Sequence, residues 1–204
     1  MFLSGKDYEG EKEMKSVKGT QTEKNLLAAF AGESQARNRY TYYASIAKKE
    51  GYEQISSLFL ETADNEKEHA KRFFQLLEGG MVEITNTYPA GIITSTIDNL
   101  KAAATGEHEE WTHLYVAAAK TAKEEGFPEI ALQFEHIALV EKEHEKRYLK
   151  LVNNIESGTI FSKVISIEWK CRNCGYHAIG NSAPVLCPGC AHPQSYFEAF
   201  SENY

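Results

Sequence analysis

Two segments of this sequence carry a glutamate and a histidine three residues apart. Glu66 and His69 lie in EKEHAKR, and Glu141 and His144 lie in EKEHEKR. Positions three apart share one face of an α-helix, so each segment would direct a carboxylate and an imidazole the same way. Mixed oxygen and imidazole ligands suit iron or manganese better than metals that prefer thiolates. One such pair would be typical of a solvated helix face, but the duplication predicts a metal site.

Two further glutamates fit the same repeat. Glu33 follows Gly32 and Glu107 follows Gly106, at nearly the same distance before the two Glu-x-x-His segments. A shared offset across two separate motifs indicates that one half of this region is related to the other by duplication. A glutamate from each of two helices plus Glu-x-x-His from two others is the recurrent ligand set of di-iron and di-manganese bundles.

Glu110 breaks the repeat, because its counterpart in the first half is Ala36. A fifth carboxylate would favour the more highly charged, oxidised state of a metal pair. We therefore hypothesise that Glu110 binds in the oxidised state and that His69 replaces it as a neutral ligand on reduction. The alternative is that Glu110 lies beside the site and binds no metal.

Two tyrosines follow the first ligand of each half at similar distances. Tyr40 is seven residues after Glu33, nearly two helical turns along the same face, and Tyr115 occupies a broadly similar place after Glu107. Each hydroxyl could hydrogen-bond a metal ligand or donate a proton during catalysis. Each tyrosine could equally be part of the bundle core with its hydroxyl satisfied elsewhere.

The four cysteines form a second candidate site. They occur as two Cys-x-x-Cys pairs separated by twelve residues: Cys171, Cys174, Cys187 and Cys190. This spacing strongly predicts tetrahedral thiolate coordination, which does not by itself distinguish zinc from a single iron. Alone it would favour a structural zinc ribbon. A neighbouring two-metal centre needs an electron supply, however. This favours a single iron, which in a thiolate site carries one electron.

Four long helical patterns position the carboxylates. Their expected spans are 20–50, 53–78, 96–125 and 128–156. The connection over 81–95 is unusually long, which favours a crossover four-helix bundle over the simple up-down kind. We thus predict a mainly α fold, with a crossover four-helix bundle over 18–157.

The chain changes character at both ends of this bundle. Residues 1–17 are polar and charged, and are expected to form a loose arm. Alternating apolar residues and Gly- and Pro-rich turns predict a small β/turn domain over 165–204.

Composition excludes several partners. The formal net charge of −7 argues against binding nucleic acid or an anionic membrane. No apolar run is long enough to span a bilayer. No export signal is recognisable at the N-terminus, so a cytoplasmic location is expected.

Taken together, these motifs resemble the rubrerythrin family from about residue 18 to the C-terminus. The resemblance is carried by AGESQARNRY (31–40), EKEHAKR (66–72), GEHEE (106–110), EKEHEKR (141–147) and CRNCGY (171–176). It implies a ferritin-like bundle with a non-haem di-iron site and a rubredoxin-like domain with one iron, three irons per chain. The implied di-iron ligands are Glu33, Glu66, Glu107, Glu110, Glu141, His144 and, depending on redox state, His69, with Glu66 and Glu141 bridging.

The same resemblance implies an activity and partners. The enzyme would reduce hydrogen peroxide to water, fed by rubredoxin or an NAD(P)H-dependent reductase. About ten residues of helix, roughly 15 Å, follow His144 before the linker, which makes a short hop within one chain unfavourable. A head-to-tail homodimer is therefore expected. The alternatives are a ferritin-type ferroxidase, an oxygen-dependent di-iron oxidase and a zinc-ribbon scaffold.

Overall fold

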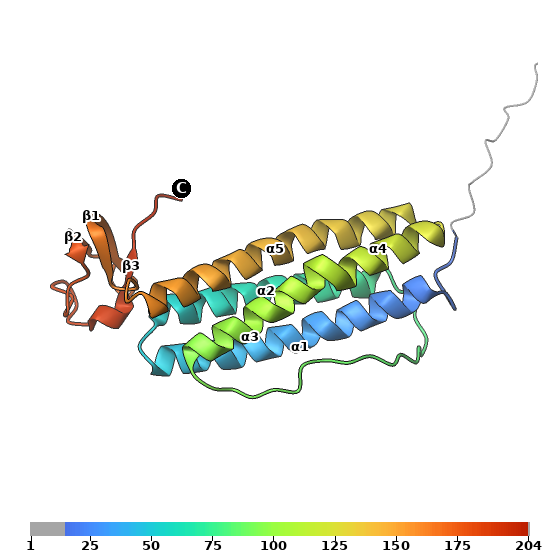
Figure 1. Cartoon of the computed structure of the whole chain (residues 1–204), viewed down its shortest axis with the longest axis horizontal. Helices are drawn as coiled ribbons and strands as arrows, with labels where there is room; N and C mark the ends of the chain where they lie inside the picture. The colour runs from blue at the N-terminus through green and yellow to red at the C-terminus, as the bar shows by residue number, and fades with distance from the viewer. Residues whose placement is uncertain (1–14, 204) are drawn as a thin grey trace, which may run out of the picture.

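The computed structural model describes residues 15–203, so residues 1–14 of the predicted arm lie outside the described part. The prediction of a mainly α fold with a small C-terminal β/turn domain is confirmed (Figure 1). The α-helices are α1 Gln21–Lys49, α2 Glu53–Gln75, α3 Thr96–Glu109, α4 Tyr115–Glu124 and α5 Pro128–Glu156. The strands are β1 Ser162–Cys171, β2 His177–Ser182 and β3 Phe197–Ala199. A π-helical segment, η1, spans Glu110–Leu114, and a 3₁₀ turn, η2, spans Gln194–Tyr196.

The helix ends follow the local sequence. The side chain of Thr20 accepts a hydrogen bond from the N–H of Glu23 and so caps α1. Pro128 opens α5, where its missing N–H costs no helical hydrogen bond. Gly79 and Gly80 follow α2 with φ of +77° and +97°, a left-handed conformation that glycine adopts without steric cost. Helix α2 ends at Gln75, three residues before its predicted end.

The long connection crosses the bundle from one end to the other (Figure 1). It lies along α1: the Tyr88 hydroxyl donates to the carbonyl of Ala28 at 2.8 Å, and the Gln35 amide donates to the carbonyl of Pro89 at 2.9 Å. A short link joins α1 to α2 as one antiparallel hairpin, and the crossover carries the chain from the end of α2 to the start of α3.

Two apolar clusters lie on either side of the middle of the bundle. One includes Tyr40, Phe59 and Tyr148, and the other includes Phe73 and Phe134. Between them along the helices lie four glutamates that are almost completely buried: Glu33, Glu66, Glu107 and Glu141. Apolar packing on both sides thus fixes a layer of buried charge at one height in the bundle.

The small domain is a three-stranded antiparallel sheet in the order β2-β1-β3. Its core contains Trp169, whose indole N–H donates to the carbonyl of Gly180 at 2.9 Å, and Phe197. The domain lies at the end of the bundle, where Phe161 stacks on Tyr52 at 6.3 Å between ring centroids. Strand β1 begins three residues before the predicted start of this domain.

The described end of the arm packs against the bundle. Val17 is buried, and its N–H donates to Glu78 Oε1 at 2.8 Å. The predicted boundary after residue 17 is therefore too late, because this apolar side chain already belongs to the core. No helix in residues 15–203 combines the length and apolarity that crossing a membrane requires.

Candidate metal centres

The bundle brings the predicted carboxylates and histidines together from four helices. Two groups form, in each of which one ligand atom per residue lies within 4.8 Å of the others. They are Glu33, Glu66, His69 and Glu141, and Glu66, Glu107, Glu141 and His144. Glu66 and Glu141 belong to both groups, which is the placement that two bridging ligands require.

Both imidazoles present the same nitrogen to the carboxylates. Nδ1 of His69 lies 2.9 Å from Glu66 Oε2 and 2.9 Å from Glu141 Oε1. Nδ1 of His144 lies 2.8 Å from Glu141 Oε2 and 3.2 Å from Glu66 Oε1. The two rings are 6.1 Å apart between centroids. The site is thus nearly symmetric about the two shared glutamates.

The donor atoms of this site fit two cations. Among the described residues, several buried atoms that face one another make no hydrogen bond of acceptable geometry: Glu33 Oε2, Glu66 Oε1, Glu107 Oε2, Glu141 Oε1 and Oε2, and His144 Nδ1. Buried polar atoms in proteins are almost always satisfied, so such a convergent set indicates missing partners. Anionic oxygens and imidazole nitrogen are the ligands of iron and manganese. The bundle therefore holds a di-metal carboxylate–histidine site.

Proton binding in the absence of metal follows from the same crowding. Burial, and then the charge of Glu66, raises the pKa of Glu107 to about 8. Burial alone would lower the pKa of His69, but the carboxylates of Glu141 and Glu66, each 2.9 Å from Nδ1, outweigh it and raise the pKa to about 10. Similar contacts raise the pKa of His144 to about 12 against the effect of burial. Metal-free protein therefore carries protons where the cations would bind.

The two predicted tyrosines bond crosswise to ligands of the other half. The hydroxyl of Tyr40 donates to Glu107 Oε1 at 2.5 Å, and that of Tyr115 donates to Glu33 Oε1 at 2.5 Å. Burial first, and then the adjacent glutamate charge, raises the pKa of each tyrosine well above its usual value. Each therefore stays neutral and keeps a ligand carboxylate oriented.

The π-helical segment marks a one-residue difference between the two halves. Glu33 and Glu107 are 74 residues apart, whereas Tyr40 and Tyr115 are 75 apart. Segment η1 lies between Glu107 and Tyr115, and a π turn accommodates one extra residue in a helix. The predicted helix over 96–125 is therefore continuous but contains a π turn, and the extra residue brings Tyr115 into register with its carboxylate.

Glu110 opens this segment and lies outside both ligand groups. It is half-buried, and burial followed by the charge of Glu107 raises its pKa well above the usual value. His69, by contrast, lies inside one of the ligand groups. Glu110 also lines a cavity of about 1540 Å³, together with Arg39 and Tyr115, between α1, α4 and the long connection. The cavity therefore reaches two residues next to the carboxylate groups, Glu110 and Tyr115.

One contact in this site has no signal in the sequence. Oδ1 of Asn65 lies 3.3 Å from Nε2 of His144, on the side of the ring that faces away from the carboxylates. Asn65 lies on α2 and His144 on α5, so no spacing along the chain links them. Only the docking of the two helices reveals the pair.

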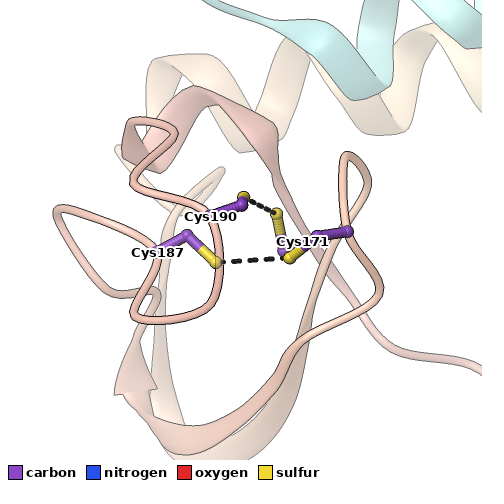
Figure 2. A group of neighbouring side chains, drawn as sticks. Cys171, Cys187 and Cys190 are labelled. Carbon is purple, nitrogen blue, oxygen red and sulfur yellow. Dashed lines mark hydrogen bonds between the residues drawn. The ribbon is translucent and has the colours of Figure 1, made fainter.

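The four cysteines converge in the small domain, and three of them are labelled in Figure 2. Sγ of Cys171 lies 3.8 Å from Sγ of Cys190, and Sγ of Cys174 lies 3.6 Å from Sγ of Cys187. A tetrahedron with metal–sulfur bonds of about 2.3 Å has edges of about 3.8 Å, so the sulfurs fit one tetrahedral ion.

Backbone groups prepare these sulfurs for coordination. A hydrogen bond from the backbone of His192 is the largest of the effects that lower the pKa of Cys190 to about 6. Each Cys-x-x-Cys pair lies within a turn closed by a backbone hydrogen bond: Gly175 N–H donates to Cys171 O and Ala191 N–H donates to Cys187 O, both at 2.9 Å. The four converging sulfurs and these fixed turns together make a four-cysteine metal site.

Comparison with protein-family models gives two matches. Residues 24–152 match the model described as rubrerythrin, and residues 169–198 match the rubredoxin-like domain of rubrerythrin. The first covers the helices that carry the carboxylates, and the second covers all four cysteines.

Comparison with individual proteins agrees. The chain is 64% identical over 190 residues to rubrerythrin of Porphyromonas gingivalis, covering 93% of this chain and 95% of that protein. It is 55% identical over 191 residues to rubrerythrin of Nitratidesulfovibrio vulgaris, covering 94% and 100%. Among solved structures, fully reduced nigerythrin is similar with a TM-score of 0.60 and 30% identity, covering 98% of this chain and 100% of that chain.

Proposed function

Because this chain belongs to the rubrerythrin family, a family of oxidoreductases, we propose that it reduces hydrogen peroxide to water at a di-iron centre in its bundle. The observation that carries this proposal is the pair of ligand groups that share Glu66 and Glu141. A bound iron pair would supply the two electrons that cleavage of the O–O bond requires. The protein supplies the geometry, the access and the protons.

The residues around the centre divide these tasks. Glu66 and Glu141 would hold a metal pair between them, and the hydroxyls of Tyr40 and Tyr115 orient the carboxylates of Glu107 and Glu33. Reduction of one peroxide to two waters consumes two protons. Glu110 faces the cavity and has a raised pKa, so its carboxyl can hold a proton where peroxide enters. Apolar packing at both ends of the layer keeps bulk water out.

We also propose iron for the four-cysteine site, because a one-electron carrier suits a centre that must be re-reduced after each turnover. The electrons would come from rubredoxin or from an NAD(P)H-dependent reductase. Twelve residues of α5 separate His144 from Glu156, about 18 Å of helix, and the small domain lies beyond that end. This separation supports a head-to-tail homodimer in which one chain's cysteines approach the partner's carboxylates.

Stopped-flow reoxidation tests the activity. Protein loaded with iron and fully reduced is mixed with hydrogen peroxide or with dioxygen, and metal content is determined on the same sample. We expect about three irons per chain and much faster reoxidation by peroxide. Preference for dioxygen would favour a ferroxidase or an oxidase instead, and zinc in both sites would exclude the redox function. Glu143→Gln changes an exposed glutamate two residues from Glu141, and it should react with peroxide like the unmodified protein.

Mixing two inactive variants tests the dimer. Cys171→Ser removes the electron carrier and Glu66→Ala removes a bridging ligand, so each homodimer should fail to turn over with its reductant. In a heterodimer, the Cys171→Ser chain keeps its carboxylate centre and the Glu66→Ala chain keeps its four-cysteine site. The heterodimer can therefore turn over only if electrons pass from one chain to the other. Recovery of activity on co-refolding is expected, and full turnover by a monomer would contradict the head-to-tail arrangement.

A further inference from the structure

The two histidines of the carboxylate centre hold equivalent repeat positions but have different surroundings. His69 and His144 are 75 residues apart, and both direct Nδ1 at the shared glutamates. On the opposite side, Nε2 of His144 lies 3.3 Å from Asn65 Oδ1, whereas Nε2 of His69 makes no hydrogen bond with any described residue. The side chain of His69 is 13% exposed and that of His144 is 4% exposed.

The contact with Asn65 selects one form of His144. An amide oxygen accepts hydrogen bonds, so it favours the tautomer with the proton on Nε2. The lone pair of the neutral ring then lies on Nδ1, the atom that faces the carboxylates. A hydrogen bond on the far nitrogen also fixes the plane of the ring, as is usual for histidines that bind metals.

The repeat shows why His69 lacks such a contact. Asn65 immediately precedes Glu66 on α2, and the residue that immediately precedes Glu141 on α5 is Val140, again 75 residues later. The isopropyl group of valine can neither donate nor accept a hydrogen bond. Val140 is 39% exposed, so an asparagine at this position would remain hydrated at little cost.

We propose that Asn65 is a positioning residue that holds His144 as a permanent metal ligand, and that Val140 at the equivalent position leaves His69 free to bind and release the metal. This inference rests on the proposed function only in taking both histidines as metal ligands. The asymmetry of the centre is then set by two side chains next to the shared glutamates, as well as by Glu110.

Reciprocal variants test the inference without iron or peroxide. The full chain is loaded with zinc, which is diamagnetic, and exchange of the imidazole N–H groups with water is followed by nitrogen–proton NMR. The protein as it stands should show one slowly exchanging Nε2–H, from His144. Asn65→Leu should abolish this signal, and Asn65→Asp, which keeps an acceptor oxygen, should retain it. Val140→Asn should add a second slow Nε2–H, from His69.

Metal affinity provides a second readout. Removal of a hydrogen-bond partner from a metal-binding histidine typically lowers affinity by about 10- to 100-fold. We expect a zinc affinity loss of this size for Asn65→Leu and none for Val140→Asn. In crystals of the iron-loaded Val140→Asn variant, His69 should occupy one position in both the oxidised and the reduced state.

Two results would overturn the inference. One is a slow Nε2–H and unchanged zinc affinity in Asn65→Leu. The other is the absence of a second slow Nε2–H in Val140→Asn, whose exposed position keeps this test available even if Asn65→Leu folds poorly. If Asn65→Leu and Val140→Asn behave as expected but the reduced iron-loaded protein does not react with peroxide, the proposed function is wrong and the role of Asn65 stands.

Discussion

The two metal centres of this chain depend on the fold in opposite ways. The ligands of the carboxylate centre come from four helices and are held between two apolar clusters that need no metal. The ligands of the thiolate centre lie within twenty residues, in turns around a core of a few side chains. We therefore expect the bundle to fold without metal and to form its site in doing so, whereas the small domain should need its metal in order to fold. Removal of metal should therefore unfold the small domain and leave the bundle folded.

The largest expected effect is loss of the small domain when its metal is lost. Fewer than about 40 residues rarely fold without a metal or disulfide, and structural metal binding contributes about 10–16 kcal/mol. Cys187→Ser should therefore unfold this domain and leave the helical circular dichroism of the bundle intact. Trp169 fluorescence, measured in a Trp111→Phe background, reports the change. Val185→Thr, at an exposed side chain two residues before Cys187, is the control, and a folded small domain in Cys187→Ser would contradict the comparison.

The second effect is a dependence of the stability of the metal-free bundle on pH. His69 and His144 have pKa values raised to about 10 and 12, and that of Glu107 is raised to about 8. The folded state then binds more protons than the unfolded state above about pH 5, so the free energy of unfolding falls as pH rises. Each extra proton contributes about 1.4 kcal/mol per pH unit. Glu66, whose pKa is lowered, opposes this trend only at acid pH.

Urea unfolding of metal-free protein between pH 6 and 10 measures this slope. Metal binding requires deprotonated ligands, so metal affinity should rise over the range in which metal-free stability falls. A metal-free stability that rises with pH would show that the carboxylates and histidines are not packed together. The measurement is made in a Cys171→Ser background, so that the four-cysteine site does not contribute to the dependence of stability on pH.

A smaller effect is expected from neutralising one buried carboxylate. Burial and the charges of Glu141 and Glu66 raise the pKa of Glu33 well above its usual value. Glu33→Gln should therefore stabilise the metal-free protein by about 1–4 kcal/mol at pH 8 while weakening metal binding. The exposed Glu68→Gln should change stability by less than about 0.5 kcal/mol. Melting curves with and without metal distinguish these cases, and destabilisation of the metal-free form by Glu33→Gln would contradict the account.

The smallest effect tests the symmetry within the carboxylate centre. Tyr40→Phe and Tyr115→Phe each remove one hydrogen bond to a charged ligand, worth about 1.5–3 kcal/mol. The two variants should weaken metal retention to similar extents, as measured by competition with a chelator. A large effect for only one of them would show that the crosswise pairs are not equivalent.

Much of the carboxylate centre could be predicted because duplication repeats its spacing. Glu66 with His69 and Glu141 with His144 are visible in the sequence, since a helix turns spacing into a shared face. The π turn could not be predicted from helical periodicity, which passes through Glu110 without interruption. It becomes apparent only when the Tyr40–Tyr115 offset is set against that of the glutamates.

The sequence leaves open whether Tyr40 bonds a metal ligand, and it does not identify the partner of a contact between two helices. The bonds from Tyr40 to Glu107 and from Asn65 to His144 join residues on different helices, so they depend on how the helices dock. The burial of Val17 is not predictable either, because its neighbours in the sequence are polar and charged. In each case the deciding interaction lies outside the local sequence.

Anomalous diffraction at the iron edge, on crystals of the iron-loaded protein, tests the central claim most directly. Two peaks are expected in the bundle, bridged by Glu66 and Glu141, and one peak is expected among the four cysteine sulfurs. Absence of any peak between the four central helices, with the glutamates bonded to other partners, would contradict it.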